Sequence, residues 1–362
     1  MDKDPNLIIH TTNPVNAEPP LSKLRENFIT PYEEFYIRNH GEIPEIDVSA
    51  FRLKINGMVN HELEFTMESL RNNFTRRTVM ATLQCAGNRR TELISVAPIP
   101  GEVPWKEGAI GNTYWTGVPL NEILRACGVS PAARYIEFIG ADEVFRHGEN
   151  VGFGASISIE KAMSEEVLLA YEMDGKPLPP THGFPLRAVV PGYIGARSVK
   201  WLNQITLQAE PSKNYFQDHA YRLFPPEADA DTVDWNSGVQ LSELNVNCAI
   251  TSPLNNAELD NGKITVQGWA IGNGGKEILR VEVSTNSGQT WTIASLSQGG
   301  ERYAWTFWET KLKLENGAHE IIARAIDMEL NTQPEDLKDV WNFKGYMNNA
   351  WHRVKITVKA NG

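Results

Sequence analysis

Apolar and polar residues alternate along the last third of the chain. In RVKITVK, Val354, Ile356 and Val358 fall on one face of an extended strand, and the lysine and threonine residues between them fall on the other. Similar alternating segments occur earlier in this region and are separated by turn signals such as Asn-Ser-Gly. They are KITVQGWAI, ILRVEVSTNSGQTWTIASL and HEIIARAID. This pattern predicts an antiparallel β-sandwich of immunoglobulin type over residues 241–362, without the Cys-Trp-Cys pattern of antibody domains.

Residues 1–240 mix strand-like and helix-like segments. FRLKI and RTVMATLQ predict strands, whereas PLNEILRACG predicts a helix, because a proline stands near its start and Gly128 follows its end. Between Gln208 and Leu241 the periodicity gives way to a stretch rich in Pro, Asp and aromatic residues. Such a stretch indicates an ordered connector that packs on a domain. The first region is therefore expected to be an α+β or α/β domain.

Length and charge exclude several classes of function. The 362 residues suffice for about two domains with a buried core. A net charge of −11 argues against partners with phosphate backbones and against anionic membranes. No apolar run reaches about 18 residues, and the acidic, proline-containing start does not resemble a signal peptide. The chain ends in VKANG, which lacks an SKL-like peroxisomal signal, so a cytoplasmic location is expected.

The cysteines bear on chemistry more directly. Cys85, Cys127 and Cys248 are three in number and widely spaced, which argues against a disulfide framework, and the sequence contains no CxxC, CxxCH or HExxH. Cys127 and Cys248 are expected to be core residues. Cys85 stands in TLQCAGNRR, where the two arginines favour a thiolate that ligates a soft metal or attacks an electrophile. Taken alone, Cys85 is equally compatible with a structural role.

Further motifs extend the context of Cys85. TLQCAGNRR is preceded by PYEEFYIRNHGEIP and followed by HGFPLRAVVPGYIGARSVKW and NNAWHRVKI. Together they resemble the sulfite oxidase family of molybdenum enzymes, from about Asn16 to Val358. The resemblance is to the short plant and bacterial forms without a cytochrome b5 domain. It implies an α+β molybdopterin-binding catalytic domain with an N-terminal arm over residues 1–240, followed by an immunoglobulin-like dimerisation domain over residues 241–362.

The resemblance also implies a cofactor, molybdopterin-bound molybdenum, with Cys85 as the thiolate that holds the metal. Soft sulfur ligands suit this metal, and no haem is expected. The alternative, purely structural roles are surface salt bridges for Arg187 and Lys200 and a core hydrogen bond for His182. The residues that match family positions around the pterin and its phosphate are Tyr36, His40, Asp142, His182, Arg187, Ser198 and Lys200.

A cluster of cations and aromatic residues matches the family's anion pocket. Arg89 would replace Arg90 in it if the register were shifted by one, and its expected role is otherwise a structural salt bridge. Trp105 has plain packing as its alternative. At Lys344 the sulfite-oxidising members usually have arginine, and lysine keeps the charge but loses the planar fork. The expected substrate-side residues are Arg38, Arg90, Trp105, Tyr221 and Lys344.

The function implied is oxidation of sulfite to sulfate by oxygen-atom transfer, with two electrons passed to oxygen or to a separate carrier. Tyr221 matches a tyrosine that the nitrate-reducing branch replaces, so it favours sulfite, whereas Lys344 leaves the preference open. The alternatives are a molybdenum enzyme acting on another oxoanion such as nitrate, and a cofactor-free binding protein. A homodimer is expected, with no nucleic-acid or membrane partner.

Overall fold

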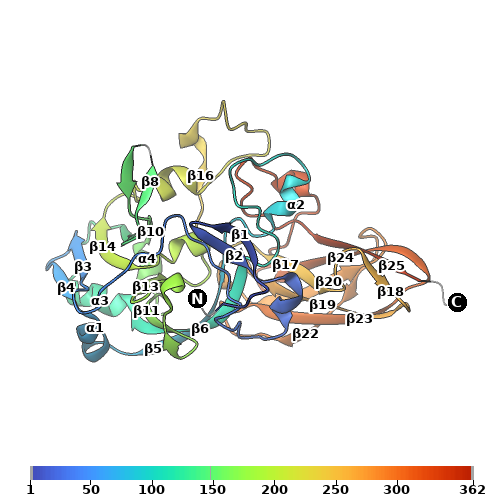
Figure 1. The fold of residues 1–362 in the computed structure, drawn as a ribbon, viewed down its shortest axis with the longest axis horizontal. Helices are drawn as coiled ribbons and strands as arrows, with labels where there is room; N and C mark the ends of the chain where they lie inside the picture. The colour runs from blue at the N-terminus through green and yellow to red at the C-terminus, as the bar shows by residue number, and fades with distance from the viewer. Residues whose placement is uncertain (1–2, 147, 360–362) are drawn as a thin grey trace.

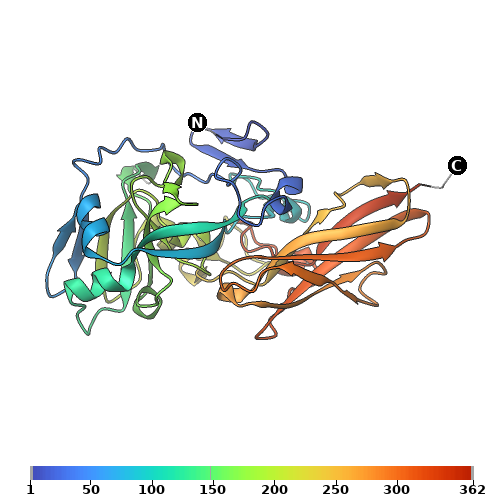
Figure 2. The same ribbon diagram turned by 90° about the horizontal axis from the view of Figure 1, so that it is seen from below.

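The chain folds into two parts that lie end to end, as Figures 1 and 2 show. The structure is a computed structural model that describes residues 3–146 and 148–359. The blue-to-yellow part is built around two five-stranded sheets, and the orange-to-red part is an elongated β-sandwich. No helix in the described ranges is long and apolar enough to cross a membrane.

The first part contains most of the helices, all of them short. In one sheet, of order β10-β7-β14-β3-β4, the β14–β3 pair is parallel, and in the other β13 pairs with β11 beside the path β12-β11-β6-β5. The strands of these sheets are β3 (Leu53–Gly57), β4 (Leu63–Phe65), β5 (Arg77–Gln84), β6 (Ile110–Pro119), β7 (Tyr135–Gly140), β10 (Gly154–Ser158), β11 (Leu168–Met173), β12 (Lys176–Pro177), β13 (Arg187–Val189) and β14 (Leu202–Gln208). The α-helices are α1 (Met67–Asn73), α2 (Arg90–Ile94), α3 (Leu120–Cys127) and α4 (Ile159–Ala162).

Short hairpins and turns of helix connect these sheets. The hairpins are β1 (Ile8–Thr12) with β2 (Val15–Glu18), β8 (Val144–Arg146) with β9 (Glu149–Val151), and β15 (Arg222–Leu223) with β16 (Val239–Gln240). The 3₁₀ turns are η1 (Leu21–Arg25), η2 (Pro180–His182), η3 (Gly195–Arg197), η5 (Trp235–Ser237) and, in the second part, η6 (Asn273–Gly275), and η4 (Phe216–Ala220) is a π-helical turn.

The helix predicted from PLNEILRACG is α3. Pro119 precedes its first residue, and the positive φ of 70° at Gly128 ends it in a conformation that suits glycine. Its apolar residues Leu120, Ile123, Leu124 and Cys127 are buried in the core of the first part. The strand predicted from RTVMATLQ is β5, with the same bounds, and FRLKI overlaps β3. An α+β domain is confirmed.

The second part is the predicted sandwich. Along β25, Val354, Ile356 and Val358 are buried and Lys355 and Thr357 are exposed, which confirms the alternation. The two sheets have the orders β17-β19-β23-β22 and β18-β25-β24-β20-β21. The elements are β17 (Asn247–Ser252), β18 (Ala257–Leu259), β19 (Lys263–Ile271), β20 (Ile278–Ser284), β21 (Thr292–Ile293), β22 (Ser295–Gln298), β23 (Thr306–Lys313), β24 (Gly317–Asp327), β25 (His352–Val358) and the short helix α5 (Leu337–Val340).

The two parts share a packed junction. Leu241, Leu244, Trp269 and Phe307 belong to the same hydrophobic cluster as the core of the first part. The connector before them is ordered as predicted, since the backbone N–H of Leu241 donates to the carbonyl of Tyr221 at 3.0 Å. Because the core continues across the junction, the boundary between residues 240 and 241 stays a prediction.

Candidate cofactor and anion site

One cavity of the first part gathers most of the predicted site. Its wall includes a residue just after β5, a loop near residue 40 and the turns η2 and η3. Residues scattered over the sequence therefore meet in one place. Ten of the thirteen predicted residues line this cavity: Tyr36, Arg38, His40, Cys85, Asp142, His182, Arg187, Ser198, Lys200 and Tyr221.

Cys85 lies directly after β5, where its backbone N–H donates to Ala109 O at 2.9 Å. The Gly87 N–H lies 3.5 Å from the sulfur. A Cβ on Gly87 would come within 2.5 Å of the Arg90 guanidinium, so only glycine lets that side chain fold back against this turn. Burial raises the pKa of Cys85, while Arg38 and Arg90 lower it. Of the two arginines in TLQCAGNRR, Arg90 acts on the thiol as predicted, whereas the other contribution comes from Arg38 and not from Arg89, and burial outweighs both.

Arg187 and Lys200 place two basic side chains in the cavity wall without an ion-pair partner among the described residues. The Arg187 guanidinium donates to the carbonyls of His182 at 3.1 Å and Ser198 at 2.9 Å. Lys200 Nζ donates to Asn39 Oδ1 and to Thr181 O. Burial lowers the pKa of Arg187 to about 10 and that of Lys200 well below its usual range. The surface-salt-bridge alternative is therefore wrong for both residues.

Asp142 and Ser198 are tied to the backbone beside these cations. Asp142 Oδ1 accepts from the Phe153 N–H at 3.2 Å, and Ser198 Oγ accepts from the Val190 N–H at 3.0 Å. Tyr36 is buried at the same wall, with its ring stacked on Phe35. The two hydrogen bonds and the ring stacking hold the three predicted residues in the cavity wall.

Lys3 contacts the cavity residue His182 from the N-terminal segment. Its Nζ lies 2.7 Å from His182 Nε2 and donates to Tyr32 O and to Phe35 O. Burial lowers the pKa of Lys3 to about 7. Burial and the neighbouring cations also lower the pKa of His182, so the imidazole is neutral. With Nε2 accepting from Lys3, Nδ1 carries the ring proton. A core hydrogen bond thus exists at His182, and the side chain still lines the cavity.

Tyr221 lines the same cavity and contacts His40. Its hydroxyl lies 3.0 Å from His40 Nε2, and its ring stacks on Tyr346 with centroids 5.2 Å apart. Arg38 Nη1 donates to Asn16 Oδ1 at 3.2 Å and to the carbonyl of Asn39. A half-buried guanidinium and a buried phenol therefore line the same cavity as the Cys85 thiol.

Three predicted substrate-side residues do not line the cavity. Arg90 is buried, donates to Val103 O at 2.7 Å, and lies over the Tyr346 ring at 5.1 Å. Lys344 forms an ion pair with Glu102. Trp105 is fully buried, its ring lies edge-to-face with that of Tyr36, and its Nε1 has no hydrogen-bond partner among the described residues. The burial of Trp105 agrees with its alternative role in core packing.

The register of the two arginines is resolved by Arg89. Its guanidinium is fully buried and makes two bonds of 2.7 Å to the Glu92 carboxylate. It also donates to Asn247 Oδ1 and to Ala350 O, and so joins the two parts of the molecule. The expected structural salt bridge is confirmed.

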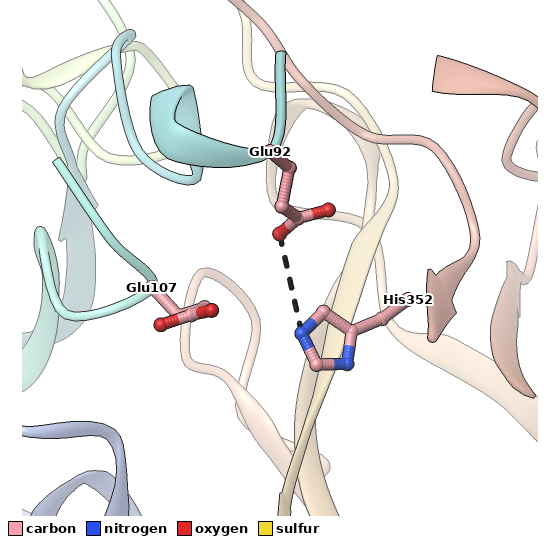
Figure 3. Close-up of side chains that lie close together, drawn as sticks. All are labelled: Glu92, Glu107 and His352. Carbon is pink, nitrogen blue, oxygen red and sulfur yellow. Dashed lines mark ion pairs between the residues drawn. The ribbon is translucent and has the colours of Figure 1, made fainter. Parts of the chain in front are cut away.

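Glu92, Glu107 and His352 form a separate cluster at this junction, shown in Figure 3. His352 Nδ1 accepts from the Ile250 N–H at 3.1 Å, which leaves the proton of the neutral ring on Nε2, the atom that faces Glu92 at 4.0 Å. The bidentate contact with Arg89 already occupies Glu92. Because the His352 nitrogen nearest the carboxylates is a donor, the cluster is suited to an ion-pair network and not to a metal ion.

Two residues near the anion site were not predicted from the sequence. Tyr346 stacks on Tyr221, and Glu102 neutralises Lys344. Tyr346 stands two residues after Lys344, so its closeness in sequence to a predicted site residue could have indicated it. Glu102 lies in a loop with no recognisable motif.

Comparisons with known proteins agree with this geometry. Residues 40–216 match the family model of the oxidoreductase molybdopterin binding domain, and residues 239–359 match that of the Mo-co oxidoreductase dimerisation domain. A sulfite oxidase of Gallus gallus is 39% identical over 97% of this chain and 78% of its own length. The chain belongs to the sulfite oxidase family. It is therefore a molybdenum oxidoreductase.

Other members of the sulfite oxidase family and its structural relatives extend the comparison. A sulfite oxidase of Arabidopsis thaliana is 38% identical over 98% of this chain and 95% of its own length. A nitrate reductase of Solanum lycopersicum is also 38% identical, but only 40% of it is covered. The solved sulfane dehydrogenase SoxCD from Paracoccus pantotrophus superposes with a TM-score of 0.80 at 27% identity, covering 97% of this chain and 86% of that chain.

The cavity fits the cofactor of the sulfite oxidase family. Asn39 lines it, and the buried Nδ2 donor of this residue has no hydrogen-bond partner in the part of the chain that the structure describes. Arg187 and Lys200 line it as well, and no ion pair within the described ranges neutralises these two bases when they are protonated. Buried charge of this kind requires an anion, and a phosphate supplies one. The Cys85 thiol shares the same cavity and offers the soft ligand that molybdenum requires.

Proposed function

We propose that this protein oxidises sulfite to sulfate with molybdopterin-bound molybdenum. The observation that carries the proposal is the composition of one cavity. A thiol, a half-buried arginine and a tyrosine line it together with two basic side chains, Arg187 and Lys200, that have no ion-pair partner among the described residues. The full-length similarity to sulfite oxidases supports the same conclusion.

The residues divide between holding the cofactor and holding the substrate. Cys85 holds the metal through its sulfur, and Arg187 and Lys200 bind the phosphate of the pterin. His182 is neutral, and its Nδ1–H is a donor for a polar pterin edge. The remaining pterin-side roles, those of Tyr36, His40, Asp142 and Ser198, rest on their places in the cavity wall. When bound, molybdenum supplies two-electron oxygen-atom transfer.

Arg38 and Tyr221 act on the anion. Arg38 presents fixed N–H donors to an oxyanion, and a guanidinium keeps its charge at every relevant pH. Tyr221 is held by His40 and Tyr346, so its hydroxyl has one position from which to hold an oxygen atom. Arg90 and Lys344 add positive charge from behind the cavity wall. Burial raises the pKa of Tyr221, which keeps the phenol protonated as a donor.

A molybdenum enzyme acting on nitrate is the second candidate, because a nitrate reductase shares 38% identity with the chain. The anion pocket alone does not separate two small oxyanions. Steady-state assays do: sulfite with ferricyanide as acceptor, and nitrate with reduced viologen as donor. We expect turnover with sulfite. The cofactor-free alternative is tested in the same preparation by the molybdenum content per chain.

The partners follow from the second part of the chain. Its match to a dimerisation domain supports a homodimer through residues 241–362. Electrons pass to oxygen or to a separate carrier, which a comparison of oxygen uptake with ferricyanide reduction distinguishes. The cytoplasmic location and the absence of haem stay predictions, tested by cell fractionation and by the absorbance spectrum.

A further inference from the structure

Glu102 places a carboxylate against two of the cations assigned to the substrate. It lies in the loop between α2 and β6. Its Oε1 pairs with Lys344 Nζ, and its Oε2 lies 3.7 Å from Arg90 Nη2. The side chains of Glu102 and Lys344 are 16% and 19% exposed, and that of Arg90 is 2% exposed. Water and salt therefore screen these charges much less than they screen surface ion pairs.

The negative charge of Glu102 acts on the tyrosines of the site. Burial raises the pKa of Tyr346, and the negative charge of the Glu102 carboxylate raises this pKa further. Tyr346 lies under both Arg90 and Lys344 and stacks on Tyr221, which lines the cavity. Packed aromatic rings thus connect the Glu102 ion pairs to the space beside Cys85.

This arrangement sets up a competition between anions. Arg38, Arg90 and Lys344 would attract an oxyanion, whereas Glu102 repels it and holds Lys344. Coulomb energy scales with the product of the charges. The repulsion by Glu102 is therefore about twice as large for a dianion as for a monoanion at the same place. Sulfate carries two charges at neutral pH, and sulfite is partly protonated there.

We propose that Glu102 is a specificity-determining residue of the anion pocket, which weakens the retention of doubly charged oxyanions and so speeds the release of sulfate. This inference rests on the proposed sulfite oxidation for its biological meaning. Its physical content, a charge-dependent penalty on bound anions, holds for any oxyanion that enters the pocket.

Titration calorimetry with the molybdenum-loaded protein tests the inference without turnover. The probes are sulfate and nitrate, and the variant is Glu102→Gln, which keeps the shape and removes the charge. We expect the Kd of sulfate to fall about 10-fold and that of nitrate about 3-fold, because the dianion gains the square of the monoanion's factor. Sulfate should also become a stronger inhibitor of sulfite turnover.

Two further variants keep the result interpretable. Glu329→Gln breaks a comparable lysine pair with Lys276 on the surface of the sandwich and should change neither Kd. Glu102→Asp keeps the charge and should keep sulfate binding near that of the wild type. Circular dichroism and molybdenum content confirm that each variant is folded and loaded.

The outcomes separate this inference from the proposed function. A folded, loaded Glu102→Gln variant that binds sulfate no more tightly than the wild type overturns the role of Glu102. Equal gains for sulfate and nitrate overturn it too, because charge would then not be the selective factor. If sulfate binding tightens as expected but the wild type does not oxidise sulfite, the role of Glu102 stands and the proposed function fails.

Discussion

Replacing Lys344 by Met should raise the KM for sulfite while changing kcat little. The variant removes a positive charge that is only 19% exposed and close to Tyr346. A hydrogen bond to a charged group contributes about 1.5–3 kcal/mol, which corresponds to about 10- to 150-fold in affinity. In the resting protein, however, Lys344 is held by Glu102, and an anion must share it. We therefore expect the lower end, a rise in KM of about 10-fold.

Steady-state kinetics with sulfite and ferricyanide measure this effect. Lys344→Arg is the matched control, since it keeps the charge and adds the planar fork, so KM should fall or stay level. The double variant Lys344→Met/Glu102→Gln should recover part of the lost affinity. In the single variant Lys344→Met, the Glu102 carboxylate has lost its lysine partner and repels the anion, and Glu102→Gln removes this charge. Unchanged constants in Lys344→Met would refute a contribution of Lys344 to anion binding. A loss confined to kcat would show that the lysine acts on the transition state instead of on ground-state binding.

Three other predictions concern the metal, the junction and the dimer. Cys85→Ser should lose molybdenum and sulfite oxidation but keep its circular dichroism spectrum, since a hydroxyl has nearly the volume of a thiol but is a hard ligand; a loaded, active variant would remove Cys85 from the metal. Burial lowers the pKa of His352 from 6.5 to about 4, so the folded state binds fewer protons than the unfolded state between these values. The free energy of unfolding should therefore decrease as the pH falls from 6.5 to 4, by about 3 kcal/mol for this group. Urea unfolding of His352→Gln should show a correspondingly weaker pH dependence, and an equal dependence in both proteins would contradict this cause. Light scattering should give a dimer, and a mass near 40.5 kDa at micromolar concentration would count against it.

Local periodicity was sufficient to predict much of the fold. The alternation around Val354 reports a sheet with one buried face, and the proline and glycine around α3 report its two ends, because both signals depend only on neighbouring residues. The predicted strand RTVMATLQ has the bounds of β5 for the same reason. How the two parts pack together was not predictable in this way, because their shared core joins residues that are distant in sequence.

The site was predicted only where a motif marked it. Cys85 and Arg187 stand in motifs that resemble a family, and both line the cavity. Lys3 and Glu102 carry no such mark. Their partners, His182 and Lys344, are 179 and 242 residues away in sequence, so only the folded chain brings them together. The sequence predicted a thiolate at Cys85 because the arginines after it in TLQCAGNRR are visible in the sequence. The structure shows a raised pKa instead, because the burial that causes it is a property of the fold.

The most direct test of the proposed function is sulfite-dependent reduction of ferricyanide by purified protein whose molybdenum content is measured in the same sample. We predict about one molybdenum per chain and two ferricyanide ions reduced for each sulfite converted to sulfate, as two-electron chemistry requires. Molybdenum-loaded protein that leaves sulfite unchanged but reduces nitrate with viologen would contradict the account.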